Sequence, residues 1–387
     1  MTGDVTVIIP TFDRWDALGQ CLTAVSAQSA SARIAEVIVV DDGSPTRPPE
    51  GLGEGLPLTV LTQPNKGPAA ARNRALARAR GDLVWILNDD AVPAPGCLAA
   101  LLAYRDAVPG CGSVLGRFDL LDSLMTTPFM RMVAEGTMLF AYDLMEHGRS
   151  YDWQFFWTCN ILVDRAAIDR VGRFDETTFG TLWGAEDAEL GYRLKRDLGI
   201  RTHYCATAAC GHDHVVTLDQ FMRKRFMLGR NLYRMYRRHD LPRAIYMPDG
   251  FSYGATTHAR VAARVAARRA AADVALDRLT RIFARPAFPA GTEAATLPAL
   301  RCLVQTLGQE RLNDGILSEA AGTYGEPEPG AASVGPDRRF DIHVAALLRM
   351  IEQRLGAAAP RLVLGPLPRR PLTVDLDRPT AQPAFAI

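Results

Sequence analysis

Two adjacent carboxylates, Asp89 and Asp90, follow Asn88 near the end of the stretch 81–93. The short apolar run before them lies between a Gly-Asp turn and this polar break, which is typical of a fully buried strand. Open α/β sheets place their ligands at the carboxyl ends of such strands. Because neighbouring carboxylates repel each other, the stretch predicts a metal bound together with a charged substrate. The alternative for an isolated pair is an acidic turn that caps the next helix.

Polar residues also follow the other strands expected in the first ninety residues. Pro10 stops the β-branched run 5–9, and Asp41-Asp42-Gly43-Ser44 ends the run 36–40. A third run, 58–61, leads through 63–67 into an Ala-rich helix over 69–79, and residues 15–28 show helical spacing. Strand and helix therefore alternate. This order predicts an α/β fold with a mostly parallel sheet, helices on both faces, and a ligand over the carboxyl edge.

The same alternation continues to about residue 215. We expect helices over 95–104 and 165–171, a helix that the stretch 183–187 opens, and strands over 112–118, 157–164 and 202–208. Residues 120–152 are rich in Met, Phe and Tyr without clear periodicity and are expected to form a lid or an acceptor-binding insertion.

The remaining residues predict helices and no chemistry of their own. Helices are expected over 219–238, 257–272, 297–321 and 340–355, with a Gly/Pro linker over 322–336 and a Pro-rich tail. The first of these is basic and amphipathic. The second is rich in Ala and Arg, and its apolar stripe favours packing on the catalytic domain over adhesion to an anionic membrane or acceptor. The predicted division is a catalytic domain over 1–215, a basic helical extension packed on it over 216–285, and a C-terminal helical segment over 286–387.

Composition limits the partners. A formal net charge of +1 gives no reason to expect nucleic acid. Seven scattered cysteines indicate a reducing compartment, so we expect a cytoplasmic protein, with peripheral contact at the inner face of the membrane as an open alternative. The N-terminus does not resemble a signal peptide, and no apolar run approaches the ~20 residues of a spanning helix.

The turns also exclude two common nucleotide sites. The sequence contains neither the G-x-G-x-x-G dinucleotide fingerprint nor the G-x-x-x-x-G-K-[ST] phosphate loop. A nucleotide would be held by carboxylates and isolated basic residues.

Taken together, the strand ends resemble the inverting family 2 glycosyltransferases of GT-A fold. The matching stretches, in order, are VIIPTFDR at 7–14, VIVVDDGS at 37–44, NKG at 65–67 with ARN at 71–73, LNDD at 87–90, FDE at 174–176 and WGAEDAEL at 183–190. The resemblance covers residues 5–214 and does not extend over the C-terminal portion.

The resemblance implies a nucleoside diphosphate sugar donor, with a UDP-sugar and hexosyl transfer favoured. It assigns nucleoside contacts to Pro10, Thr11, Asp13, Asp41 and Asp42. It also places Lys66 and Arg72 where a cationic side chain and a helix N-terminus can meet the diphosphate.

The stretch 88–90 occupies the place of the family's D-x-D motif, which chelates Mn²⁺ or Mg²⁺ on the donor diphosphate. Asn88 replaces the first Asp, so we assign the direct metal contact to Asp90 and leave Asn88 and Asp89 to the sugar or to indirect contacts. The resemblance implies His212 as a further ligand, with His214 as the second choice. A zinc site built from these histidines with Cys205 and Cys210 is the alternative.

The resemblance places the catalytic base at the second residue of the pair Glu186 and Asp187. Single displacement needs one base to take the acceptor proton, and Asp187 is assigned that role. The alternative is that both acids are there to favour a first helical turn. Trp183 and Asn160 are expected near the acceptor, and Trp153 and Trp157 either stack on a sugar or pack in the core.

The sequence thus predicts an enzyme, a metal-dependent glycosyltransferase that transfers one sugar, since the Q-x-x-R-W motif of processive synthases is absent. Two alternatives remain, a nucleotidyltransferase of similar fold and a catalytically inactive nucleotide-sugar-binding protein. The acceptor class (glycan, lipid, peptide or natural product), the sugar and the oligomeric state do not follow from the sequence.

Overall fold

The computed structural model describes residues 4–134, 138–181, 184–239, 255–324 and 335–356. The chain divides into two compact units. Unit 1 comprises Met1–Leu124 and Phe140–Val215, and unit 2 comprises Met125–Leu139 and Val216–Ile387. Each unit is described by itself below.

Unit 1 is built on a single mixed sheet with the strand order β3-β2-β1-β4-β8-β6-β9-β5, and β7 pairs with β9. The strands are β1 (Val5–Thr11), β2 (Ile34–Asp41), β3 (Leu58–Thr62), β4 (Leu83–Leu87), β5 (Ala91–Pro93), β6 (Ser113–Leu120), β7 (Ser150–Tyr151), β8 (Asn160–Asp164) and β9 (Thr202–His212). The first four strands pair in parallel, as the sequence predicts. Strand β8 then runs antiparallel between β4 and β6.

The direction of these strands brings the polar ends of β1, β2, β4 and β9 to one edge of the sheet. Strands β4 and β6 both run antiparallel to β8, so they point the same way. Strand β9 is parallel to β6 and therefore also points the same way as β4. All five residues of β4 are buried, which explains why its sequence is uniformly apolar. Strand β9 continues to His212, beyond the predicted end at residue 208, so this histidine lies on the sheet edge itself.

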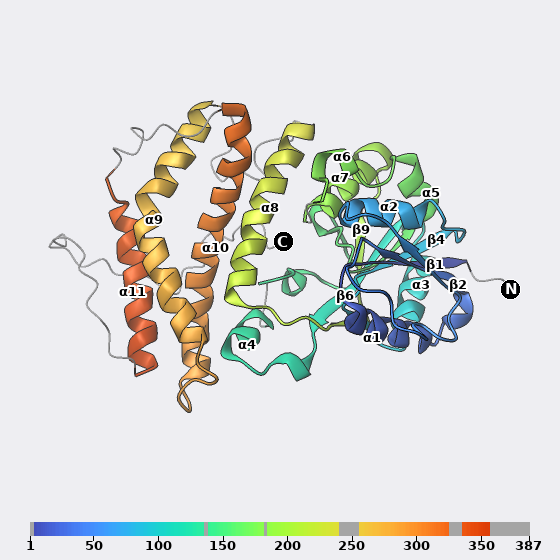
Figure 1. The fold of residues 1–387 in the computed structure, drawn as a ribbon, viewed down its shortest axis with the longest axis horizontal. Coiled ribbons are helices and arrows are strands. Elements are labelled where there is room, and N and C mark those ends of the chain that lie inside the picture. The colour runs from blue at the N-terminus through green and yellow to red at the C-terminus, as the bar shows by residue number, and fades with distance from the viewer. Residues whose placement is uncertain (1–3, 135–137, 182–183, 240–254, 325–334, 357–387) are drawn as a thin grey trace. The chain divides into compact units, whose positions relative to one another are not determined.

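Helices cover both faces of this sheet, as expected (Figure 1). Helix α3 packs against β6 and β9, and α2 packs against β1 and β2. The helices of unit 1 are α1 (Trp15–Ser26), α2 (Pro68–Leu76), α3 (Cys97–Ala107), α5 (Arg165–Arg170), α6 (Glu176–Phe179) and α7 (Glu186–Leu198). The α/β layering with a carboxyl-edge site is that of the GT-A fold.

Unit 2 is helical in the part that the structure describes. It contains α4 (Pro128–Ala134), α8 (Leu218–His239), α9 (Ala255–Phe283), α10 (Glu293–Tyr324) and α11 (Arg338–Arg354). Helix α8 packs closely along α10, where a Cβ on Gly229 would lie 2.0 Å from the Leu312 carbonyl oxygen. Arg230 and Arg234 of α8 form ion pairs with Glu319 of α10, so part of the basic face is neutralised within this unit. The predicted packing of 216–285 on residues 1–215 stays a prediction.

Among the described residues, no helix is both long and apolar enough to cross a membrane. Residues 120–152 form short elements of which η2 (Asp122–Leu124), α4, η3 (Tyr142–Leu144) and β7 are described.

Candidate active site

Asp89 and Asp90 lie buried at the carboxyl end of β4, as the sequence predicts. Asp89 accepts a hydrogen bond from the Thr11 hydroxyl at the end of β1 (2.9 Å). The Arg14 guanidinium bridges both acids, with Nη1 3.1 Å from Asp89 Oδ1 and Nη2 2.7 Å from Asp90 Oδ2. His212 Nε2 lies 3.3 Å from the same Asp90 oxygen. The ends of β1, β4 and β9 therefore converge on one carboxylate pair.

The two carboxylates differ in their protonation. Burial, together with the neighbouring Asp90 charge, raises the pKa of Asp89 to about 6, although Arg14 opposes this shift. Burial would also raise the pKa of Asp90, but hydrogen bonds and charge from His212 and Arg14 outweigh it and lower that pKa. Asp90 is therefore the acid held most firmly as an anion, which is the state that a metal ligand needs.

Three side chains of this cluster fit a divalent cation. Asp90, His212 and His214 each offer one ligand atom, and these atoms lie within 4.8 Å of one another. Asp90 Oδ1 and His212 Nδ1 are buried and have no hydrogen-bond partner among the described residues, so the cluster has unused ligand capacity. The Phe118 ring stacks on His212 with centroids 4.5 Å apart and holds its plane. Carboxylate oxygens suit Mn²⁺ and Mg²⁺ and imidazole nitrogens suit transition metals such as Zn²⁺, so this mixed ligand set fits a divalent metal ion without selecting one.

The alternative zinc site finds no support in the described residues, because the three-ligand group there includes neither Cys205 nor Cys210. The Cys205 thiol instead contacts the Ala100 carbonyl oxygen and the Thr207 hydroxyl.

The residues assigned to the nucleoside line the ends of β1 and β2. Asp41 is buried and accepts hydrogen bonds from the Ser44 backbone N–H (2.9 Å) and hydroxyl (2.5 Å). Ser44 Oγ also accepts from the Asp13 backbone N–H, which joins the two loops. Asp13 itself is exposed with φ +53°, a conformation that few non-glycine residues adopt. Pro10 is half-buried at the end of β1.

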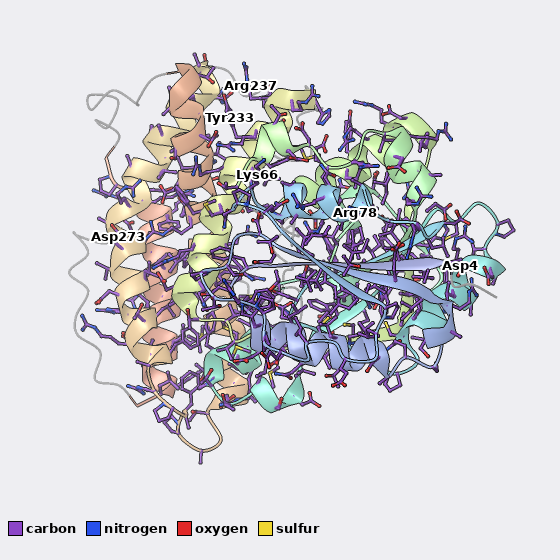
Figure 2. The ribbon with its side chains drawn as sticks, turned by 45° about the vertical axis from the view of Figure 1, so that its right-hand side comes forward. Asp4, Lys66, Arg78, Tyr233, Arg237 and Asp273 are labelled. Carbon is purple, nitrogen blue, oxygen red and sulfur yellow. The ribbon has the colours of Figure 1, made fainter. Side chains whose placement is uncertain are left out.

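Asp42 organises the loop that leads into α2. Its carboxylate accepts from the Gln63 side chain, the Lys66 backbone N–H and the Gly67 backbone N–H. Both oxygens are thereby occupied, which suits a positioning role, and the nucleoside contact assigned to Asp42 stays a prediction. Lys66 is exposed at the start of α2, where its side chain is accessible to a phosphate (Figure 2).

Arg72 is buried in α2, and its Nη1 donates to Glu186 Oε1 at 2.9 Å. Its guanidinium also lies over the Phe174 ring. Glu186 Oε2 accepts from the Gly184 backbone N–H at 2.6 Å. Both side chains assigned to chemistry are therefore engaged with protein partners. The pair is well placed to fix the segment around Asp187, and the diphosphate contact assigned to Arg72 stays a prediction.

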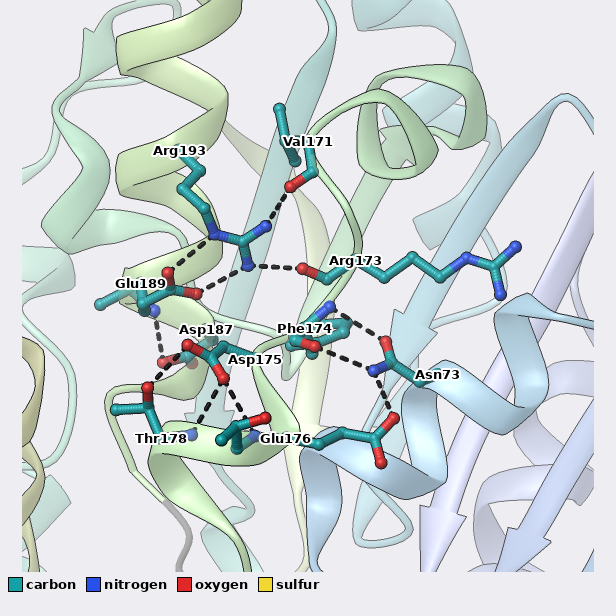
Figure 3. A network of polar contacts seen from close by, with 12 residues as sticks. Asn73, Val171, Arg173, Phe174, Asp175, Glu176, Thr178, Asp187, Glu189 and Arg193 are labelled. Atoms are coloured by element: carbon teal, nitrogen blue, oxygen red, sulfur yellow. Dashed lines mark hydrogen bonds and ion pairs between the residues drawn. The ribbon is translucent and has the colours of Figure 1, made fainter. Parts of the chain in front are cut away.

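The segment before Asp187 is strained and clamped. Ala185 has φ +73°, which costs a residue with a Cβ about 1 kcal/mol or more, so surrounding contacts must impose it. Residues of α2 and its entry loop contact the chain upstream of Ala185. Gly67 provides one of these contacts, because a Cβ there would lie 2.5 Å from the Gly180 carbonyl oxygen. Asn73 provides another through hydrogen bonds with the Phe174 backbone and the Glu176 side chain (Figure 3). Helix α2 thus holds the segment that presents Asp187.

Asp187 remains half-buried at the start of α7. Its Oδ1 accepts from the Ala188 backbone N–H at 2.8 Å, and its Oδ2 lies 3.4 Å from the Thr158 backbone nitrogen. Burial and the adjacent Glu186 charge raise the pKa of Asp187 to about 7, with Arg72 opposing them. A carboxylate with such a pKa can accept a proton near neutral pH. Burial raises the pKa of Cys159 to about 12, and the charges of Asp187 and Asp90 both add to this shift, so both acids lie near one thiol.

The structure describes all but one of the residues expected at the acceptor. Trp183 lies outside the described residues. Asn160 is fully buried, and its amide bonds to Trp85 Nε1 and to the Ala208 carbonyl oxygen, so direct acceptor contact stays a prediction with no geometric support. Trp153 and Trp157 are also buried, which favours the core-packing alternative.

Two residues of this site have no role in the sequence-based assignment. Arg14 is the cation that bridges Asp89 and Asp90, and Ser44 fixes the Asp41 carboxylate. Both belong to the stretches that carry the resemblance, so the signal was their position directly after a strand end. Their partners lie up to 76 residues away in the sequence, and only folding reveals those contacts.

The fold and the site define an α/β domain with a carboxylate–histidine cluster at the strand ends that could hold a cation. Residues 6–172 match the model of glycosyl transferase family 2, which supports assigning this part of the chain to that family.

Named relatives agree with this assignment. The chain is 31% identical over 241 residues to the pre-mycofactocin glycosyltransferase of Mycobacterium tuberculosis. The aligned region covers 58% of this chain and 46% of that protein. It is 27% identical over 216 residues to the validoxylamine A glucosyltransferase of Streptomyces hygroscopicus subsp. jinggangensis, covering 49% and 51%. The chain therefore spans about half the length of these relatives. A mannosyltransferase from Pyrobaculum calidifontis, solved with GDP-Man and Mn²⁺, aligns at 18% identity and a TM-score of 0.44 over 91% of this chain and 87% of its own. A similarity of that size does not establish a shared site.

Proposed function

We propose that the chain is a metal-dependent inverting glycosyltransferase that moves one sugar from a nucleoside diphosphate sugar to an acceptor nucleophile by single displacement. A UDP-sugar is the favoured donor. The observation that carries the proposal is the joint presence of a cation cluster, Asp90 with His212 and His214, and a half-buried acid, Asp187, with a pKa near neutrality. The match of residues 6–172 to the family model supports it.

Each residue of the candidate site would have a separate role in this reaction. A divalent ion held by Asp90, His212 and His214 would supply charge neutralisation for the leaving nucleoside diphosphate. Asp41 would accept from the nucleoside, and Lys66 would contact the diphosphate. Asp187 would take the proton from the acceptor as its nucleophile attacks the anomeric carbon from the face opposite the leaving group. The ion pair of Arg72 with Glu186 would position that base.

The product distinguishes this proposal from the nucleotidyltransferase alternative. A panel of nucleoside diphosphate sugars with Mn²⁺ should yield a nucleoside diphosphate by slow hydrolysis even without acceptor. Release of pyrophosphate from a nucleoside triphosphate and sugar phosphate would contradict the proposal.

The acid limb of the pH profile gives a second test. Because Asp187 must be ionised to accept a proton and its pKa is raised to about 7, turnover should fall as the pH drops below about 7, by roughly tenfold per pH unit. Steady-state rates between pH 5.5 and 8.5 at saturating Mn²⁺ and donor measure this limb. A rate that stays flat down to pH 5.5 would remove Asp187 from the base role.

The buried pair beside Asp187 should move that limb in opposite directions. Glu186→Gln removes a charge that raises the pKa of Asp187, so the limb should shift to lower pH. Arg72→Met removes a charge that lowers it, so the limb should shift to higher pH. Each change also breaks a buried ion pair, at a cost of about 3–5 kcal/mol in the free energy of unfolding. Urea unfolding measures that loss, and equal shifts in one direction would show a purely structural effect.

The relatives suggest acceptor classes without fixing one. One is named for pre-mycofactocin and another for validoxylamine A, which fits the small natural product already among the candidate acceptors, beside a glycan, a lipid or a peptide. We also keep a cytoplasmic location, with peripheral membrane contact as the alternative, as a proposal.

A further inference from the structure

Arg14 contacts both carboxylates of the cation cluster, although it is not itself a ligand. Its guanidinium lies 3.1 Å from Asp89 Oδ1 and 2.7 Å from Asp90 Oδ2. The side chain of Arg14 is 36% exposed, whereas those of Asp89 and Asp90 are 8% and 5% exposed. A partly exposed guanidinium thus forms ion pairs with two buried carboxylates.

The contact with Asp90 uses the oxygen that lies nearest both histidines. Asp90 Oδ2 faces Arg14 Nη2 at 2.7 Å, His212 Nε2 at 3.3 Å and His214 Nδ1 at 3.8 Å. Hard divalent ions bind carboxylate oxygens at about 2.0–2.6 Å. An ion on this oxygen and the two histidines would therefore stand against the Arg14 guanidinium, and two cations that close repel each other.

The position of Arg14 allows it to leave. It precedes α1 as the N-cap residue and makes no capping hydrogen bond through its side chain. A rotamer change at a half-exposed side chain moves the guanidinium off Asp90 without requiring the buried acids to move.

We propose that Arg14 is an exchangeable counter-ion of the cation cluster, bound to Asp90 in the free protein and displaced when a divalent ion enters. This inference rests on the proposed function, since the diphosphate of the donor is the anion that would receive the released guanidinium. Arginine is well suited to this contact because its planar fork matches phosphate as well as carboxylate. The exchange makes ion and nucleotide binding mutually reinforcing, so Mn²⁺ binds weakly alone and tightly with a nucleoside diphosphate.

The test is Mn²⁺ binding to the full chain, measured by calorimetry with and without saturating UDP. Arg14→Met removes the competing charge and should tighten Mn²⁺ binding at least tenfold without UDP, while the enhancement by UDP shrinks. Arg14→Lys, whose ammonium is a point charge without the planar fork, should give a smaller change in the same direction. Arg33→Met is the matched control, because Arg33 forms an ion pair with Asp4. Asp4 directly precedes the first residue of β1, at the end of the strand opposite to Thr11 (Asp4 is labelled in Figure 2).

The outcomes separate two failures. Unchanged or weaker Mn²⁺ binding in both Arg14 variants, with wild-type circular dichroism, overturns the exchange and leaves the proposed function intact. If Arg14→Met does not fold, Arg14→Lys decides alone by the same criterion. Absence of Mn²⁺ binding to the wild-type chain, with and without UDP, overturns the metal site itself and with it the exchange.

Discussion

Replacing Asp187 with Asn should abolish sugar transfer while the donor still binds. Asn keeps the size of the side chain and can still accept from the Ala188 backbone N–H, but it cannot take a proton. Loss of a positioned general base costs about 10²–10⁴ in rate. We therefore expect turnover to fall by about that factor, with the dissociation constant for UDP and Mn²⁺ within about twofold of wild type. Product formation and calorimetric titration measure the two quantities separately.

A matched control lies in the same segment. Asp175 caps α6 by accepting from the Thr177 and Thr178 backbone N–H groups, and Asn is an equally good capping residue. Asp175→Asn should therefore leave turnover nearly unchanged. Wild-type turnover in Asp187→Asn would sink the assignment of the base, and a loss of turnover in both variants would point to a disturbed segment instead.

His212→Ala should raise the Mn²⁺ requirement steeply. In this chain Asn88 stands where the family has an acidic residue, so the charged ligand set rests on Asp90 with the histidines at the end of β9. Removing one ligand of three should weaken Mn²⁺ binding by at least about 10–100-fold, the range already seen when only an outer partner of a ligand is lost. Activation curves for donor hydrolysis and direct Mn²⁺ titration both report this change.

His203→Ala provides the comparison, because His203 lies on the same strand and contacts Tyr104 away from the acidic pair. It should keep the wild-type Mn²⁺ dependence. Unchanged Mn²⁺ dependence in His212→Ala would show that this part of the site is drawn wrongly. A still larger loss in His214→Ala would shift the main ligand role to His214, which lies farther from Asp90 Oδ2 at 3.8 Å.

The sequence predicts the strand ends of this site well, because each signal is local. Asp41 is the last residue of β2, Asp90 lies in the turn after β4, and Glu186 opens α7. The apolar runs of the two strands and the acidic first turn of the helix are visible in the sequence. The parallel order of β1 to β4 then requires their ends to meet. The family resemblance supplied the roles that spacing alone left open.

Contacts between distant residues escape that reasoning. The partner of Arg72 is Glu186, 114 positions later in the sequence, and neither stretch by itself indicates this buried ion pair. Asn160 of β8 is a second example, because its side-chain amide accepts from Trp85 of β4 and donates to the Ala208 carbonyl oxygen of β9. These contacts depend on the order of the strands in the sheet, which the sequence around Asn160 does not indicate. The antiparallel insertion of β8 between β4 and β6 likewise has no local signature.

Calorimetric titration of the wild-type chain with UDP, GDP and the other nucleoside diphosphates, with and without Mn²⁺, tests the central claim most directly. The site predicts binding of at least one of them, UDP first, that strengthens at least tenfold when Mn²⁺ is present, and loss of that strengthening in Asp90→Asn. Binding of none of these nucleotides, or binding that Mn²⁺ does not change, would contradict a metal-dependent donor site at Asp90.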